Sequence, residues 1–308
     1  MVPGPGVLPD VLPTDRLLAG GKATPELRTH LRSIPQWRSA MACVMVFVEP
    51  VAVIAAAIWL SHPVAWVAAF LLMGRAYARF ASLGHEAVHR TLFNNKSLND
   101  WVGRWLMSYP MWVPFELYRR AHLDHHRDEM GPKEPDIPLY TNYPVTKASF
   151  RRKLLRDATG RTGWKLFVGL LKAARKRKPT AVRILVCQVP IIAAFTVIGR
   201  PELYFFLWWL PQQTVWRVIN RLRAVAEHGG MMRSSDRRLT THDVHQNHLA
   251  KFWMVPFNIG NHLAHHVDMG VNCWRLPEFH RELVGSGWVT EGYTYPNYRS
   301  LWRALASG

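Results

Sequence analysis

Three clusters of histidines constrain this chain more than any other feature of its sequence. Two share the pattern H-x-x-H-H and the third has the pattern H-x-x-x-H. Their members are His122, His125 and His126, then His262, His265 and His266, and lastly His85 and His89. Residues three and four apart share one face of a helix, so each cluster can direct its imidazoles at one point. Imidazole is the commonest metal ligand in proteins, and the sequence therefore predicts a polyhistidine metal site.

Four apolar runs predict an all-α integral membrane protein. They lie at 41–60, 64–80, 182–198 and 203–219. Each approaches the length that a helix needs to cross a bilayer, and short turns at 61–63 and 199–202 join them into two hairpins. Glu49 interrupts the first run, where an ionisable group either has a function or faces another helix.

The distribution of basic residues predicts the orientation of these spans. The two short turns are nearly free of Lys and Arg, whereas the segment 81–181 contains nineteen. Basic loops remain on the cytoplasmic side of a membrane. We therefore expect a multi-pass protein with both termini in the cytoplasm and a cytoplasmic helical cap that carries the histidine clusters.

The net charge of +18 points to an anionic partner. The apolar runs make membrane lipids the first choice, and no nucleic-acid-binding motif is present. The segment 151–178 has eleven Lys or Arg residues and one acid, Asp157, with apolar residues among them. This pattern predicts a basic amphipathic helix on the membrane surface, or else a solvated basic face.

The rest of the chain is expected to form one domain. Residues 1–25 are rich in proline and glycine and predict a mobile, disordered tail. Residues 26–308 contain all spans and all histidine clusters, and they form the single predicted membrane domain.

The number of histidines bears on the kind of metal. His85-Glu86-Ala87-Val88-His89 matches H-E-x-x-H, the zinc-binding helix of metalloproteases. A zinc protease needs only three protein ligands, which leaves both H-x-x-H-H triplets unexplained. Eight histidines exceed the coordination number of one metal ion, so two ions fit them better. We expect iron because it can activate dioxygen.

The order of the boxes around a long apolar hairpin resembles the membrane fatty-acid desaturase superfamily, which also contains hydroxylases and ketolases. Three more segments look like that family, namely 226–228, 255–258 and 276–280. The resemblance implies that His228 is a ninth ligand of a di-iron centre. In the acyl-CoA branch of the family an asparagine holds a metal-bound water, and Ala224 stands at that position here, which makes the acyl-CoA branch less favoured.

The resemblance implies oxygen-dependent desaturation of a fatty-acyl chain, carried by a lipid, coenzyme A or a carrier protein. No cytochrome domain is visible in the sequence, so we expect electrons from a separate protein such as a ferredoxin or a small cytochrome. A di-iron hydroxylase or ketolase of a lipid or carotenoid is the main alternative, and an intramembrane zinc metalloprotease is a minor one. A non-enzymatic membrane anchor would make no use of the histidines.

One or more of the carboxylates beside the boxes are expected to orient metal ligands, because metal-bound imidazoles normally donate their second N–H to a carboxylate or carbonyl. A solvent-facing charge is the alternative for each of them. The residues concerned are Glu86, Asp124 and Glu227. Histidines outside the boxes are not expected to bind metal. We assign a surface or interfacial role to His242, His245 and His248, and a structural role to His30, His62 and His280.

Overall fold

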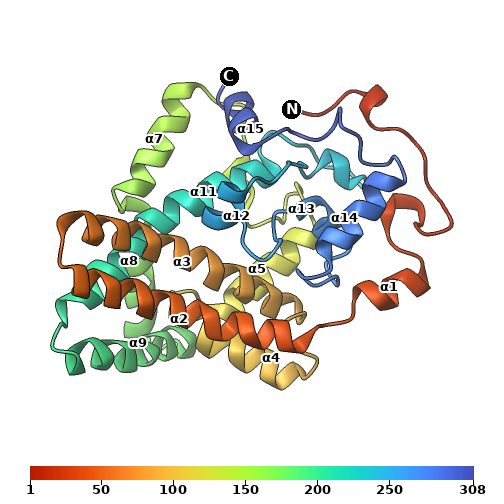
Figure 1. The fold of residues 1–308 in the computed structure, drawn as a ribbon. Coiled ribbons are helices and arrows are strands. Elements are labelled where there is room, and N and C mark those ends of the chain that lie inside the picture. The colour runs from red at the N-terminus through yellow and green to blue at the C-terminus, as the bar shows by residue number, and fades with distance from the viewer.

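The chain folds into helices without a β-sheet. A computed structural model describes residues 1–308, and Figure 1 shows its helices joined by short turns and loops. Strand pairing is limited to two isolated bridges, Leu17 with Ala23 and Val244 with Tyr295. The predicted all-α class is confirmed.

Three long helices make up the most apolar part of the molecule: α2 (Gln36–Leu60), α3 (Pro63–His89) and α9 (Pro179–Val197). The segments Pro25–Leu60, Pro63–His89 and Pro179–Val197 are long and apolar enough to cross a membrane. They contain the first three predicted spans. Helix α3 continues without a break beyond its apolar part, and it ends on two histidines of the predicted metal site.

The fourth predicted span, 203–219, is helical but divided. It consists of the π-helical η4 (Tyr204–Trp209), α10 (Leu210–Gln213) and the start of α11 (Val215–His228). The break falls at Thr214, whose φ of −120° and ψ of −82° are not helical. Just before it, the buried Gln212 side chain donates a hydrogen bond to the carbonyl of Met111 (2.8 Å). No single helix here has the length of a span, so the fourth span stays a prediction.

Helices α3 and α11 approach each other closely. A Cβ atom on Gly74 would lie 2.3 Å from the Cβ of Val215, so only glycine allows this approach. One turn further along α3, the hydroxyl of Tyr77 donates to the carbonyl of Trp208 (2.6 Å), and the Phe80 ring packs edge-on against Trp208. The approach of Gly74 to Val215 packs α11, which ends at His228, against the helix that carries the first histidine box.

The remaining helices are shorter. They are α1 (Pro25–Leu31), α4 (Lys96–Val102), the π-helical η3 (Gly103–Ser108), α5 (Phe115–Arg127), α6 (Ile137–Tyr140), α7 (Lys147–Ala158), α8 (Arg161–Arg175), α12 (His248–Trp253), α13 (His262–Val267), α14 (Leu276–Gly285) and α15 (Tyr298–Leu305), with short 3₁₀ turns η1 (Pro5–Val7), η2 (Ala19–Gly21) and η5 (Arg237–Leu239). Two of them, α5 and α13, carry the H-x-x-H-H triplets.

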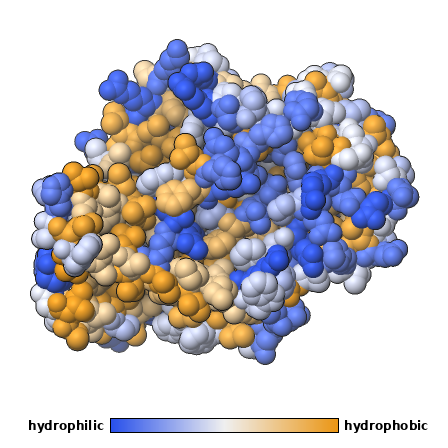
Figure 2. Space-filling view, viewed as in Figure 1, coloured by the Kyte–Doolittle hydropathy of each residue, from blue (hydrophilic) through white to orange (hydrophobic).

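The surface divides into an apolar and a hydrophilic part. Figure 2 shows apolar side chains gathered over α2, α3 and α9, and hydrophilic side chains on the opposite part of the molecule, around α14. Large apolar residues such as Val51, Trp59 and Val197 are exposed on the long helices. An exposed apolar surface of this extent is typical of a membrane-embedded region, and the chain is a membrane protein.

The basic segment 151–178 differs from its prediction as one helix. It forms the last turns of α7 and the whole of α8, with a break at Gly160, whose φ of +75° is left-handed. The one acid of the segment, Asp157, is buried and pairs with Arg221 of α11. The segment is therefore two basic helices, attached to the core at their junction.

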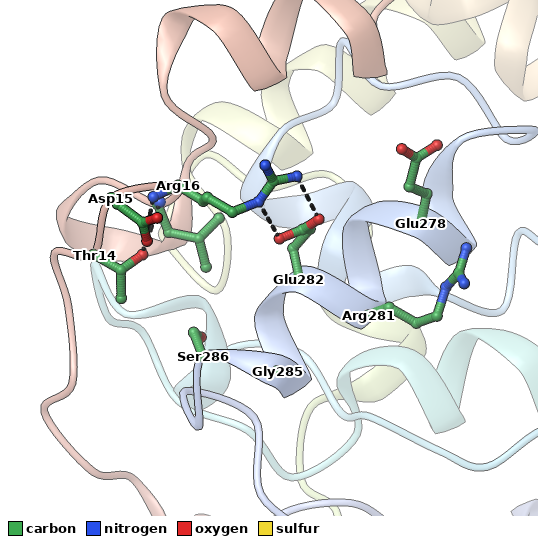
Figure 3. A pocket seen from close by; sticks show the side chains of 9 residues that line it. Thr14, Asp15, Arg16, Glu278, Arg281, Glu282, Gly285 and Ser286 are labelled. Carbon is green, nitrogen blue, oxygen red and sulfur yellow. Dashed lines mark hydrogen bonds and ion pairs between the residues drawn. The ribbon is translucent and has the colours of Figure 1, made fainter.

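The N-terminal segment lies against α14. Leu17 and Ala23 are buried, and the Arg16 guanidinium forms two hydrogen bonds with the Glu282 carboxylate (2.7 and 2.8 Å). Figure 3 shows this ion pair at the edge of a cavity of about 730 Å³ between the two elements. The predicted mobility of residues 1–25 and the single domain at 26–308 stay predictions.

Candidate metal centre

The structure brings all nine predicted histidines together from four helices. They come from the end of α3, from α5, from α13 and from the last residue of α11. The first histidine of each triplet lies three and four residues before the other two, so each box lines one side of its helix. Contrary to our expectation, the three rings of a triplet do not meet at one point but are divided between two groups. Eight of the nine are buried, and His89 is partly buried.

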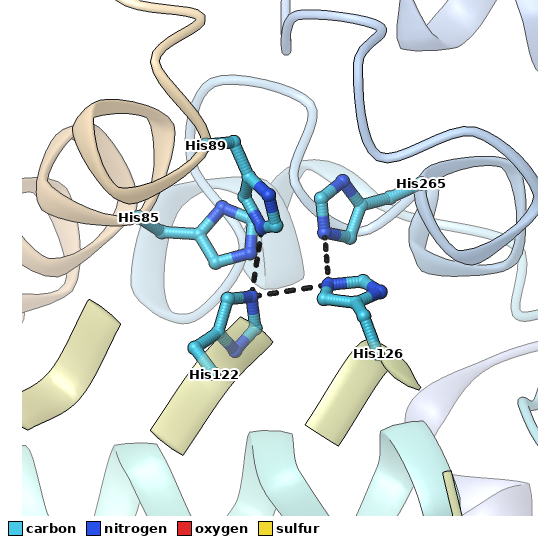
Figure 4. A group of neighbouring side chains, drawn as sticks. All are labelled: His85, His89, His122, His126 and His265. Carbon is cyan, nitrogen blue, oxygen red and sulfur yellow. Dashed lines mark hydrogen bonds between the residues drawn. The ribbon is translucent and has the colours of Figure 1, made fainter. Parts of the chain in front are cut away.

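Five of them form a first group: His85, His89, His122, His126 and His265. Figure 4 shows their rings facing one another from α3, α5 and α13. The Nε2 atom of His122 lies 2.9 Å from that of His89 and 3.2 Å from that of His126. The Nε2 atoms of His126 and His265 are 3.0 Å apart.

The other four form a second group beside the first. His125, His228 and His266 are close enough to share one ion, and His262 joins them through its Nε2 atom, 3.1 Å from that of His228 and 3.0 Å from that of His266. The Nε2 atoms of His125 and His266 are 3.4 Å apart. Because His125 and His126 are neighbours on α5, the two groups adjoin.

The protonation of these rings suits metal binding. Burial, followed by the neighbouring imidazoles, lowers the pKa of the histidines that lie outside the long helices: His122, His126, His228, His262, His265 and His266. They are therefore neutral at neutral pH, and each keeps one ring nitrogen with a free lone pair.

The contacts between ring nitrogens test whether metal ions fit this site. The Nε2 atom of His122 faces two other Nε2 atoms, although a neutral ring has only one N–H to donate. Both ring nitrogens of His85 are buried without a hydrogen-bond partner. Converging nitrogens without protons between them are satisfied when they ligate a cation, so the donor set fits two metal ions.

Partners at the outer nitrogens fix the orientation of several rings. The Nδ1 atom of His228 lies 2.9 Å from the carbonyl of Thr240, to which it can donate. The Nδ1 atom of His125 pairs with Glu134. Burial would lower the pKa of His125, but the hydrogen bond and the charge of Glu134 raise it above its ordinary value. Such partners leave Nε2 free to face the metal.

The three predicted orienting carboxylates differ in their positions. Glu86 is buried, lies 3.5 Å from Nδ1 of His85 and accepts the backbone N–H of Cys273 (2.8 Å). Glu227 lies 3.5 Å from Nδ1 of His262. Asp124 does not reach the cluster, because its exposed carboxylate pairs with Arg127 one helical turn away. The expectation for Asp124 is therefore wrong.

Two further carboxylates, Glu129 and Glu134, contact the histidines although neither was predicted from the sequence. Glu129 Oε1 lies 3.0 Å from Nδ1 of His266 and 3.5 Å from Nδ1 of His228, so this carboxylate contacts two predicted ligands. Thr241 donates to it (2.9 Å), and Arg237 pairs with it. The acidic run Asp128-Glu129 directly after the second box is the signal that would have indicated such a role.

Histidines outside the boxes lie away from the cluster. His245 is exposed beside Glu291, and His280 pairs with Asp243 (2.9 Å). His242 is buried, and its Nε2 atom lies 2.8 Å from the carbonyl of Gly229. The expected surface role of His242 is wrong, because this backbone contact holds the ring inside the protein.

Comparison with known proteins decides the family. The profile of the fatty acid desaturase family matches residues 61–298, which include all nine histidines. The chain belongs to the fatty acid desaturase family. It is therefore an oxidoreductase of a family that binds iron, and this membership accounts for all three histidine boxes.

Curated relatives are similar at low identity. Dihydrorhizobitoxine desaturase from Bradyrhizobium elkanii is 24% identical over 71% of this chain and 66% of its own length. The sn-1 oleoyl-lipid 12-desaturase from Arthrospira platensis is 38% identical over 24% of this chain and 20% of its own length. The sn-1 acyl-lipid omega-3 desaturase (ferredoxin) from Nostoc sp. (strain 36) is 30% identical over 33% and 26%. The matches span less than two thirds of these relatives.

Proposed function

We propose that this protein desaturates a fatty-acyl chain of a lipid at a di-iron centre, with dioxygen as co-substrate and electrons from a separate donor protein. The observation that carries the proposal is the pair of adjoining histidine groups. One ring nitrogen from each of five histidines lies within 4.8 Å of the others in the first group, and the four histidines of the second group meet through their Nε2 atoms. Two metal ions held in this way suit a reaction that needs two electrons from the site.

The nine histidines would hold the ions, and two bound irons would supply the oxidising power that removes two hydrogens from adjacent carbons with dioxygen. The protein contributes ligand geometry. Glu129, Glu134 and the Thr240 carbonyl keep their histidine rings turned with Nε2 inward. Rings that are already oriented need to move less when metal ions bind and when the reaction takes place.

Burial of the histidines also excludes bulk water from the site. The rings of both groups lie in the interior, where Ala87, Leu263 and Ala264 are fully buried beside them. A site without bulk water prevents side reactions of an oxidant and admits an acyl chain more readily than a polar molecule. The long apolar helices are suited to cross the membrane in which acyl chains reside, so a substrate could approach the site from the bilayer.

The electron donor is proposed from charge. The four residues Arg175, Lys176, Arg177 and Lys178 are exposed and have no ion-pair partner. An acidic protein such as a ferredoxin would be steered to such a surface. The relative from Nostoc carries ferredoxin in its name, which supports this class of donor. We place the histidine cluster and both termini on the cytoplasmic side, in agreement with the positive-inside rule.

Product analysis tests the proposed reaction. The protein is expressed in a host of defined lipid composition, and the acyl chains are examined by mass spectrometry beside an inactive control, His126→Ala. We expect chains that have lost two hydrogens and carry a new double bond. Chains that have gained an oxygen atom instead would identify a hydroxylase and contradict the proposal.

A further inference from the structure

A cluster of charges outside the histidine groups lies between the long helices. Arg75 and Arg79 are one turn apart on α3, and both pair with Glu49 of α2. They line a pocket of about 280 Å³ together with Lys251 of α12 and the segment 255–258. Ionisable residues inside membrane segments are rare and commonly mark a binding site.

The positive charges of this pocket outnumber the negative ones. Three cations line it, and Glu49 is the one carboxylate that contacts any of them. Arg75 also donates to the carbonyl of Phe252 (2.7 Å), but Arg79 has no hydrogen-bond partner besides Glu49, and Lys251 has none. The pocket therefore holds an excess of positive charge with unused N–H donors, which is suited to an oxyanion.

The aromatic and backbone surroundings hold the guanidinium groups in place. The Phe252 ring lies 4.0 Å from the Arg75 guanidinium, and the Phe257 ring lies 5.1 Å from that of Arg79. Phe257 and Asn258 both have left-handed backbone angles, with φ of +54° and +62°. Two successive non-glycine residues in this region are costly, and such strain is concentrated at binding and catalytic sites.

The rim of the pocket indicates where the anion comes from. On α2, Val48 and Val51 are exposed on either side of Glu49, and on α12, Leu249 and Phe252 are exposed beside Lys251. Figure 2 shows hydrophilic surface reaching between apolar surfaces at this part of α3. An apolar rim around a cationic pocket suits a molecule that has both an apolar body and an anionic head.

We propose that Arg75, Arg79 and Lys251 form a binding site for the phosphate of a membrane phospholipid. The two guanidinium groups and the ammonium group would contact the phosphate oxygens, and the apolar rim would contact the acyl chains. Arg79 precedes His85 by six residues, about 9 Å along α3. The site is thus close to the histidine cluster, but it needs neither metal nor turnover to bind its lipid.

Lipid binding to the purified protein in neutral detergent tests this site, with native mass spectrometry as the measurement. Phosphatidylglycerol should bind more tightly than diacylglycerol with the same chains. Lys251→Gln, at an exposed position without a partner, should weaken phosphatidylglycerol binding about fivefold, the effect of one cation at an anionic lipid surface. Lys22→Gln, an equal charge change on the exposed N-terminal segment, should leave binding unchanged.

Removal of the one acid gives a prediction of opposite sign. Glu49→Gln frees both guanidinium groups and should tighten phosphatidylglycerol binding, whereas a purely structural ion-pair cluster would bind less lipid or none. If Glu49→Gln does not fold, Lys251→Glu should weaken binding more than Lys251→Gln does. Equal binding of the two lipids, or an equal loss in Lys22→Gln, would overturn the proposal. Displacement of the lipid by millimolar inorganic phosphate would show a free-anion site and would overturn it as well.

Discussion

His228 joins the histidine cluster from outside the three boxes. It is buried, its Nε2 atom lies 3.1 Å from that of His262, and the Thr240 carbonyl holds its other nitrogen. We predict that His228→Ala abolishes turnover and lowers bound iron while the protein stays in the membrane. His245→Ala is the matched control, since this exposed ring contacts only Glu291, and it should keep most of its activity and iron. The reverse pattern would show that His228 is not a ligand.

Glu129 contacts two predicted metal ligands but was not among the predicted orienting carboxylates. Its carboxylate lies 3.0 Å from Nδ1 of His266 and 3.5 Å from that of His228. Its loss would leave the His266 ring without this partner, whereas the Thr240 carbonyl would still hold His228. We predict that Glu129→Gln lowers iron affinity or activity about 10- to 100-fold, the usual effect of removing a partner of a metal ligand. The measurement is iron retention against a chelator. Asp124→Asn should behave like the unmodified protein, and an equal loss in both variants would contradict this role.

Spacing along a helix was sufficient to predict the histidine boxes, whereas the carboxylates required the structure. Each box holds histidines three or four residues apart, so local helix geometry alone brings those rings to one side of the helix. Glu129 lies in the turn after α5 and reaches His266 of α13, which is far away in the sequence. Asp124 turns outward although it lies inside a box. Closeness to a histidine box in the sequence therefore does not determine whether a carboxylate faces the histidines.

At the scale of elements, the end of α8 and the linker to α9 carry the exposed basic residues. Changing Arg175, Lys176, Arg177 and Lys178 to Gln should raise the concentration of donor protein needed for half-maximal activity, because charge steers the encounter. Activity with a small-molecule reductant should be unchanged, since the histidines are untouched. Donor titrations in neutral detergent at low and high salt measure the effect.

A segment that binds only anionic lipid would give a different result. The variant would then show the same donor dependence as the unmodified protein in neutral detergent, and it would associate less with anionic bilayers. That outcome would contradict the docking role of α8.

Elements were predictable to different degrees. The long apolar runs predicted α2, α3 and α9 because runs of this length and composition are typical of helices that cross a membrane. The division of the fourth run arises from Thr214 and from a buried glutamine that donates to Met111, a contact across a hundred residues of sequence. Gly160 likewise divides the basic segment through its left-handed backbone, which composition alone does not specify.

At the scale of the whole molecule, a shared metal site requires that all nine histidines lie on the same side of the membrane. We predict that reporter fusions at Pro63 and Arg200 lie outside the cytoplasm, and that fusions near Lys133 and Gly308 lie inside it. The reason is the concentration of basic residues in the segment 81–181. A cytoplasmic signal at Pro63 would be incompatible with this topology.

The metal content of the purified protein tests the central claim most directly. Nine converging imidazoles predict about two iron ions per chain, because a single ion has too few coordination positions for them. The measurement is elemental analysis of protein purified from the membrane, with His228→Ala as the depleted control. About two irons per chain, lowered in the variant, is the predicted result. One zinc ion per chain, unchanged in the variant, would contradict the di-iron centre.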